Sequence, residues 1–111
     1  MQEAKAKQTN IKMPARKLRR VINEVRGKSV DEAVRLLRFM PYFAARVVEH
    51  NLKAAVANAS EKFGATSASL KISEIFADES VTLKRARPRA QGRMYARTRR
   101  TSHLSITVAS K

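Results

Sequence analysis

The segment 84–100 constrains the fold of this 111-residue chain more strongly than any other part of the sequence. It has eight cations in 17 positions and no acid, and the chain contains no Asp or Glu from position 80 onward. A charge run of this kind is often a disordered basic loop, so the run alone leaves disorder and order equally open. The cations are Lys84, Arg85, Arg87, Arg89, Arg93, Arg97, Arg99 and Arg100.

Strand-like patterns on both sides of this segment favour order. Apolar residues recur at every second position over 70–83, with a bulge expected near Glu74 where their parity shifts. Residues 103–108 alternate polar and apolar, as in a half-buried strand. Pro88 and Gly92 are turn-forming residues between the two strands. We therefore predict a long antiparallel ribbon, an arm over about 80–100 with its tip around 88–93.

The predicted ribbon needs support from outside the chain. About 14 residues per strand would reach roughly 45 Å, well beyond the roughly 13 Å radius of a compact body of this size. An isolated hairpin is at best marginally stable in water. Phosphate groups, which arginine side chains bind with two parallel hydrogen bonds, are the obvious external partner.

The remainder of the chain predicts one short strand and three helices. Residues 3–8 suggest an edge strand, and Pro14 with Gly27 bracket a helix over 14–26. A capping box of Ser29 and Glu32 starts a second helix, which ends before Pro41. A third helix covers about 42–63, and Gly64 ends it. The first helix has cations that could contact phosphate or simply be solvated, namely Arg16, Lys17, Arg19, Arg20 and Arg26.

Net charge points to a polyanionic partner. The chain carries 24 Lys and Arg against 9 Asp and Glu, a formal charge of +15. Self-repulsion on this scale opposes a compact state unless a polyanion relieves it. An anionic membrane would call for a basic amphipathic helix or a lipidation motif, and neither stands out. Nucleic acid is thus the favoured partner of what we expect to be one domain over 1–111.

Composition argues against several other classes of protein. The absence of Cys rules out disulfides, thiol catalysis and cysteine-based zinc knuckles. The N-terminal residues include no apolar signal region, and no window approaches the roughly 18 apolar residues of a membrane span. We therefore expect a soluble protein of the cell or organelle interior.

Catalytic and metal-binding clusters are not apparent, so we expect no catalytic residue, no metal and no cofactor. His50 and His103 are isolated, and His103 is expected to meet backbone or phosphate. Neighbouring strand residues such as Asp78 and Glu79 point to opposite faces and cannot cooperate as acid and base. Most phenylalanines are expected in the core. Tyr95, among arginines, could stack on an unpaired base or pack across the ribbon.

Several motifs resemble the large-subunit ribosomal protein family twenty-two. They are LKRARPRAQGR at 83–93, RRTSHLSITV at 99–108, EAKA at 3–6, RGKSVDEA at 26–33 and AVANA at 55–59. They lie in collinear order over nearly the whole chain. The chain departs from the family pattern at Pro14-Ala15, where a Ser-Pro usually supplies a hydroxyl helix cap, and at Met94-Tyr95.

The resemblance implies an α+β fold with three helices packed on a three-stranded antiparallel sheet and one long protruding β-hairpin. It implies a structural constituent of the large subunit, on a bacterial ribosome or in a plastid or mitochondrion. Its partners would be 23S-type ribosomal RNA, neighbouring large-subunit proteins and the nascent peptide, because the hairpin tip would line the exit tunnel. The tip would comprise Arg87, Pro88, Arg89, Ala90, Gln91, Gly92 and Arg93. Thr101, Ser102 and His103 would join the RNA-binding cations on the returning strand.

Two other functions are compatible with parts of the sequence. An architectural DNA-binding protein could insert Arg87-Pro88 as a wedge at the tip of a basic ribbon. A small RNA-modifying enzyme would need a catalytic cluster that the sequence lacks. Preference for bent duplex DNA, or turnover on RNA, would distinguish these from a ribosomal RNA-binding protein.

Overall fold

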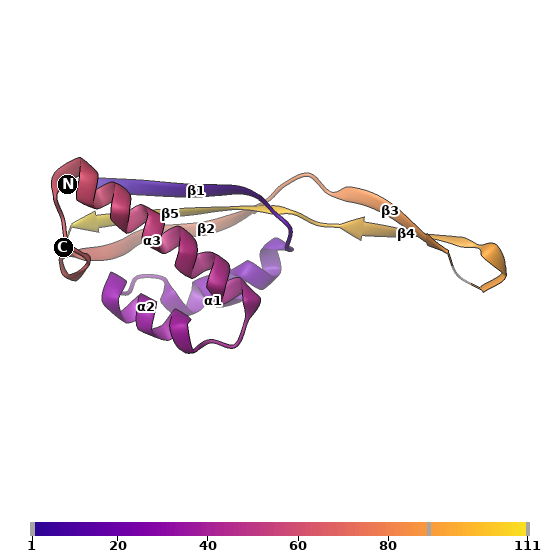
Figure 1. The fold of residues 1–111 in the computed structure, drawn as a ribbon, viewed down its shortest axis with the longest axis horizontal. Coiled ribbons are helices and arrows are strands. Elements are labelled where there is room, and N and C mark those ends of the chain that lie inside the picture. Colours follow the sequence, from indigo (N-terminus) through magenta and orange to yellow (C-terminus); the bar gives the residue numbers. More distant parts are fainter. Residues whose placement is uncertain (1, 89, 111) are drawn as a thin grey trace.

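The computed structural model describes residues 2–88 and 90–110. Its body contains an antiparallel sheet of three strands, β1 (Glu3–Ile11), β2 (Leu70–Glu79) and β5 (Ser102–Ser110). The strand order is β1-β5-β2, so the last strand in the chain lies at the centre of the sheet (Figure 1). The register between β2 and β5 shifts between Ile72 and Glu74, which confirms the predicted bulge.

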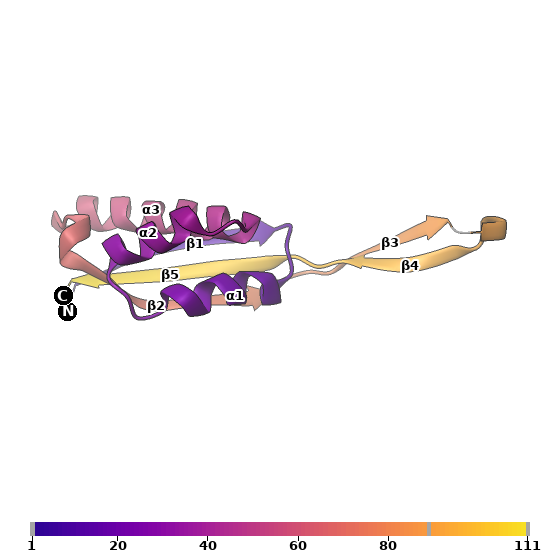
Figure 2. The same cartoon turned by 90° about the horizontal axis from the view of Figure 1, so that it is seen from below.

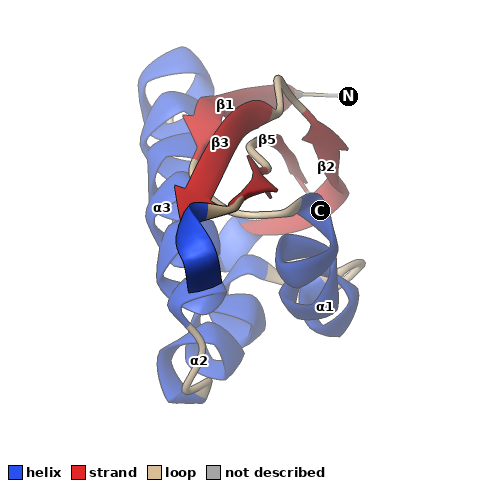
Figure 3. Cartoon of the chain, turned by 90° about the vertical axis from the view of Figure 1, so that its right-hand side faces the viewer, coloured by secondary structure: helices blue, strands red, loops and turns tan. Residues whose placement is uncertain are grey.

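Within the described residues, three α-helices cover one face of this sheet. They are α1 (Ala15–Val25), α2 (Val30–Phe39) and α3 (Phe43–Phe63), followed by a short 3₁₀ turn at Ser67–Ser69. Figure 3 shows α3, α2 and α1 arranged around one side of the strands. Alternate residues of β2 are buried because only one face of the sheet meets the helices. No helix in these ranges is long and apolar enough to span a membrane.

The core lies between the sheet and the apolar sides of the helices. From α1, Leu18, Val21, Ile22 and Val25 are fully buried, as their helical spacing predicts. Ala45, Ala55 and Ala59 of α3 are also fully buried, and these small side chains let the helix approach the sheet closely. α3 packs on β1 and β5, whereas α1 packs on β2.

The helix ends follow from local sequence. Pro14 precedes α1 without a side-chain cap, as expected where the hydroxyl residue is missing. Ser29 accepts a hydrogen bond from the Glu32 N–H, so half of the predicted capping box is present. The Glu32 carboxylate lies 3.9 Å from Lys28 Nζ. Gly64, at φ 65°, ends α3 in the left-handed conformation that glycine adopts without strain.

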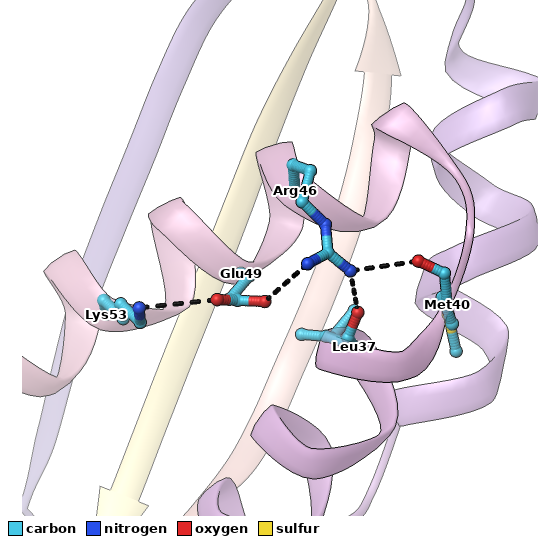
Figure 4. Close-up of polar contacts among 5 residues, drawn as sticks. All are labelled: Leu37, Met40, Arg46, Glu49 and Lys53. Atoms are coloured by element: carbon cyan, nitrogen blue, oxygen red, sulfur yellow. Dashed lines mark hydrogen bonds and ion pairs between the residues drawn. The ribbon is translucent and has the colours of Figure 1, made fainter.

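An arginine from α3 holds the turn between α2 and α3. Arg46 donates through one nitrogen to the carbonyls of Leu37 and Met40, the latter at 3.0 Å (Figure 4). Its other terminal nitrogen lies 3.6 Å from Glu49, which also pairs with Lys53 at 3.4 Å. A cation beside the C-terminal carbonyls of α2 interacts favourably with the helix dipole. It also adds a donor to Leu37 O, which accepts the Met40 N–H at 3.3 Å.

Helix side chains also bind the carbonyls of both outer strands. Arg19 donates two hydrogen bonds to Ala77 O, at 2.8 and 3.2 Å, and Arg26 donates one to Ile75 O at 3.1 Å. On β1, three residues of α3 do the same; Asn51, Asn58 and Lys62 donate to Ala6, Lys5 and Glu3. These contacts protect strand edges that would otherwise be open to pairing with another chain.

A second sheet forms a hairpin that projects from the body. Strands β3 (Leu83–Pro88) and β4 (Met94–Arg99) pair antiparallel, from Leu83 with Arg99 to Pro88 with Met94. Figures 1 and 2 show this hairpin extending away from the helices and the three-stranded sheet. The molecule measures 61 × 25 × 17 Å. Its radius of gyration, 17.0 Å, exceeds the roughly 13 Å of a compact chain of about this length. The predicted fold class is confirmed.

Two details of the sequence-based expectation were wrong. The ribbon was expected to have about 14 residues per strand, but β3 and β4 have six each, because the ladder is interrupted over 80–82 and 100–101. Most phenylalanines were expected in the core, but Phe39, Phe43 and Phe76 are exposed. Phe63 alone packs partly against the core.

Candidate nucleic-acid interface

The hairpin arm, defined as residues 83–99, presents its described side chains to solvent. The exposed cations on it are Lys84, Arg93 and Arg99, and Arg100 follows directly. Wherever exposure is described in this arm, the residue is exposed, including Leu83 and Met94. Among the residues of the arm whose exposure is described, none is buried, so contacts to another molecule are the available source of further stabilisation.

Some of the predicted RNA-binding side chains lie outside what the structure describes. The backbone of Arg85, Arg87 and Arg97 is in the β3–β4 ladder, but their side chains are not described, and the same holds for Tyr95. Arg89 lies outside the described residues. The phosphate-binding role of these arginines, and the stacking role of Tyr95, remain predictions from the sequence.

The tip of the arm is a compact turn. Ala90–Gly92 form a short kinked turn in which Gln91 and Gly92 have left-handed backbone conformations, with φ of 63° and 72°. Pro88 ends β3 opposite Met94, where a missing N–H donor is tolerated at the edge of a ladder. Ala90, Gln91, Gly92 and Arg93 are all exposed, so the described part of the predicted tip presents backbone, a methyl group, an amide and a guanidinium group.

Two hydroxyl residues in the predicted RNA-binding set instead join the arm to the body. Ser102 is fully buried and donates to Met13 O at 2.8 Å. Thr101 is buried, donates to Val81 O at 2.5 Å, and accepts the Ser80 N–H at 2.9 Å through its carbonyl. With their hydroxyls occupied and shielded, Thr101 and Ser102 have a structural role that the sequence did not indicate.

A polar cavity of about 290 Å³ lies at this joint. It brings Arg16 from the start of α1 beside Arg100 from the chain between β4 and β5. Glu79 is the acidic residue in its lining. The other lining residues are Pro14, Ala15, Ser80, Thr82, Thr98 and Thr101. Hydroxyls beside two guanidinium groups suit an anionic ligand such as a phosphate of RNA.

Arg16 connects this joint to the exposed face of α1. A second hollow, of about 310 Å³, is lined by Arg16, Lys17 and Arg20. Because Arg16 lines both hollows, positive charge continues from α1 through the joint to the arm. We call this surface the basic strip; it comprises Arg16, Lys17, Arg20 and Arg100. Pairing of α1 with the arm was not evident from the sequence, because the two lie far apart in the chain.

Two cations of α1 have partners within the protein. Arg19, predicted to bind RNA, has its guanidinium on Ala77 O and serves to hold α1 on β2. Arg20 lies over the ring of Tyr42, with its guanidinium carbon 4.1 Å from the ring centroid. This cation–π contact orients Arg20.

His103 is bonded to backbone, one of the two partners proposed for it. Its Nδ1 accepts the N–H of Asn10 at 3.1 Å, which leaves Nε2 to carry the proton of a neutral ring. Within residues 2–88 and 90–110, His, Cys, Asp and Glu side chains form no group of three or more that could hold a metal ion.

Comparison with known protein families gives a match over nearly the whole chain. A family model described as ribosomal protein L22p/L17e matches residues 6–109. The match spans the helices, both sheets and the arm.

Proposed function

Because the chain belongs to the ribosomal protein L22p/L17e family, we propose that it binds large-subunit ribosomal RNA through the hairpin arm and the basic strip. The family makes it a structural ribosomal protein and places it in the ribosome. The observation that carries the proposal is the arm, which projects from the body, exposes its described cations and buries none of the side chains described in it.

The mechanism is neutralisation of many phosphates with release of their counterions. Arginines along the arm each meet backbone phosphates, whose positions in folded RNA fix the direction of the hairpin. Cations of the basic strip extend the same contact onto α1. Binding of RNA also relieves the repulsion within a chain of charge +15, so folding of the arm and subunit assembly support each other.

We assign the tip a separate task, that of forming part of the wall of the nascent-peptide tunnel. This tip is the segment 87–93, in which Pro88, Ala90 and Gly92 are compact backbone positions and Arg93 is an exposed cation. Neighbouring large-subunit proteins would contact the body. The role is structural rather than catalytic, on a ribosome of a bacterium, a plastid or a mitochondrion.

Salt-dependent binding tests this function. The logarithm of the association constant for large-subunit ribosomal RNA should fall linearly with the logarithm of the salt concentration. Each phosphate contact should add about one unit to the steepness of that line. The chain should also remain with large subunits through high-salt washing. A flat salt response would contradict phosphate binding, and preference for bent or nicked duplex DNA over the RNA would favour an architectural DNA-binding protein.

A further inference from the structure

Three aromatic side chains are exposed together where α2 meets α3. Phe39 is 85% exposed, Phe43 is 70% exposed and Tyr42 is 41% exposed. They flank Pro41, which separates the two helices. Exposed apolar residues grouped in this way commonly mark a binding surface, whereas scattered ones do not. We call Phe39, Tyr42 and Phe43 the aromatic corner.

The folded chain itself cannot cover the aromatic corner. α2 turns Val30, Ala33 and Leu37 to the core, so Phe39, two positions after Leu37, is directed to the opposite side of the helix. At the start of α3, Ala44 and Ala45 are the buried residues, and Phe43 precedes them on the outside. The rings are held outward by the same helical spacing that builds the core.

The chain segment that carries these rings is basic. Residues 33–48 include three arginines and no acid. Of the acids that border this segment in sequence, Glu32 pairs with Lys28. Glu49 pairs with Lys53 and also with Arg46, so it offsets one of the three arginines. Arg38 in the last turn of α2 is exposed. A partner for this surface must therefore tolerate or welcome cations, which favours an anionic one.

The aromatic corner is continuous with the basic strip. Arg20 contacts the Tyr42 ring and also lines the hollow that contains Arg16 and Lys17. Figure 1 shows that the start of α1 and the α2–α3 connection lie toward the end of the body from which the hairpin leaves. A single RNA strand lying along the strip would thus reach the rings.

From these observations we infer that the aromatic corner is a second RNA-binding site, which stacks on unpaired bases of ribosomal RNA. The inference rests on the proposed RNA-binding function and adds to it a site distant from the tip. Every base has a flat π-face, and aromatic rings beside arginines bind single-stranded nucleic acid by stacking while the cations hold its phosphates. The arm would follow phosphates, and the corner would select unpaired nucleotides.

Paired substitutions separate stacking from simple apolar contact. The variants Phe39→Ala/Phe43→Ala and Phe39→Leu/Phe43→Leu both change exposed residues, so circular dichroism should match the parent protein. Stacking requires a flat ring, and both variants should bind large-subunit ribosomal RNA roughly tenfold or more weakly, with an unchanged salt slope. Phe39→Trp should retain affinity. Arg99→Met is the matched control. It removes a proposed phosphate contact, so it should reduce the slope of affinity against salt concentration, which the aromatic substitutions should leave unchanged.

Each outcome decides the inference. If the leucine variant binds as tightly as the parent while the alanine variant does not, the contact is apolar and stacking is wrong. If both variants bind RNA normally but lose co-sedimentation with large subunits, the corner docks a protein instead. Unchanged binding in both assays also overturns the inference. If the parent chain itself binds the RNA weakly and without salt dependence, the proposed function fails first.

Discussion

At the scale of single residues, arginine serves two different purposes in this protein. Arg19, Arg26 and Arg46 direct their guanidinium groups to backbone carbonyls of the body. Arg93, Arg99 and Arg100 are exposed on or beside the arm. Sequence alone does not separate the two groups, because the use of a cation depends on which carbonyl lies within reach after folding. Total charge therefore overstates the number of cations available to RNA.

Arg46 is expected to stabilise the body. Substitution by Met retains most of the apolar stem, removes the side-chain donor to Met40 O, and leaves Leu37 O with only the Met40 N–H. We expect the free energy of unfolding to fall by about 1–2 kcal/mol, the usual cost of losing a charged hydrogen bond at a partly exposed site. Urea unfolding followed by circular dichroism would measure it. Arg38→Met, an exposed change at the end of α2, is the control, and equal stability of the two variants would contradict this role.

Arg19 and Arg99 should give opposite results in two assays. Arg19→Met removes the donor to Ala77 O, so it should lower stability by about 1–2 kcal/mol and leave the salt slope of RNA binding unchanged. Arg99→Met should leave stability unchanged and reduce the slope by about one. Urea unfolding and filter binding at several salt concentrations measure the two effects. Loss of slope in the Arg19 variant would show that Arg19 contacts phosphate directly.

At the scale of secondary-structure elements, the body and the arm are two separate sheets, and a short hydrogen-bonded segment connects them. Ser80, Thr101 and Ser102 are hydrogen-bonded where β2 and β5 give way to β3 and β4. Helix side chains hold the carbonyls of β1 and β2. The body therefore has its own core and protected edges, and the side chains described in the arm belong to neither.

Deletion of residues 87–93 should leave the body folded. No described side chain of the tip belongs to the apolar core, and the joint lies well before the tip. We expect the helical circular dichroism signal and the unfolding midpoint to stay close to those of the parent, and the variant should still enter large subunits. Its subunits should show altered sensitivity to antibiotics that bind the tunnel. Global unfolding of the variant would contradict the independence of the body.

Much of this architecture follows from periodicity in the sequence. The apolar spacing of Leu18, Val21, Ile22 and Val25 predicts the buried side of α1, and the parity shift near Glu74 predicts the bulge. Contacts between distant segments do not follow from it. The joint cavity is lined by Arg16 and Arg100, which are far apart in the sequence. The aromatic corner is linked to α1 by the contact of Arg20 with the Tyr42 ring. Local patterns carry no information about which helix end meets which strand end, so these features required the fold.

At the scale of the whole molecule, the part that projects farthest from the body is also the most basic part of the chain. The long axis of 61 Å is more than twice the next, 25 Å, because the hairpin extends the body rather than folding back on it. Acids are confined to the first 79 residues, so the sequence of the arm and of the strand that follows it contributes only neutral and positive side chains. An elongated cation of this kind is suited to insertion between phosphate-lined segments of RNA.

The central claim is that the arm enters the subunit and brings its tip to the tunnel wall. A photoreactive benzophenone side chain in place of Gln91, an exposed residue of the tip, tests this in ribosomes that hold a radiolabelled nascent peptide. We predict cross-links to the nascent peptide and to large-subunit ribosomal RNA. The same group in place of Glu61, exposed on α3, should give no cross-link to the peptide. Cross-links from position 91 to neither the peptide nor the RNA would contradict the account.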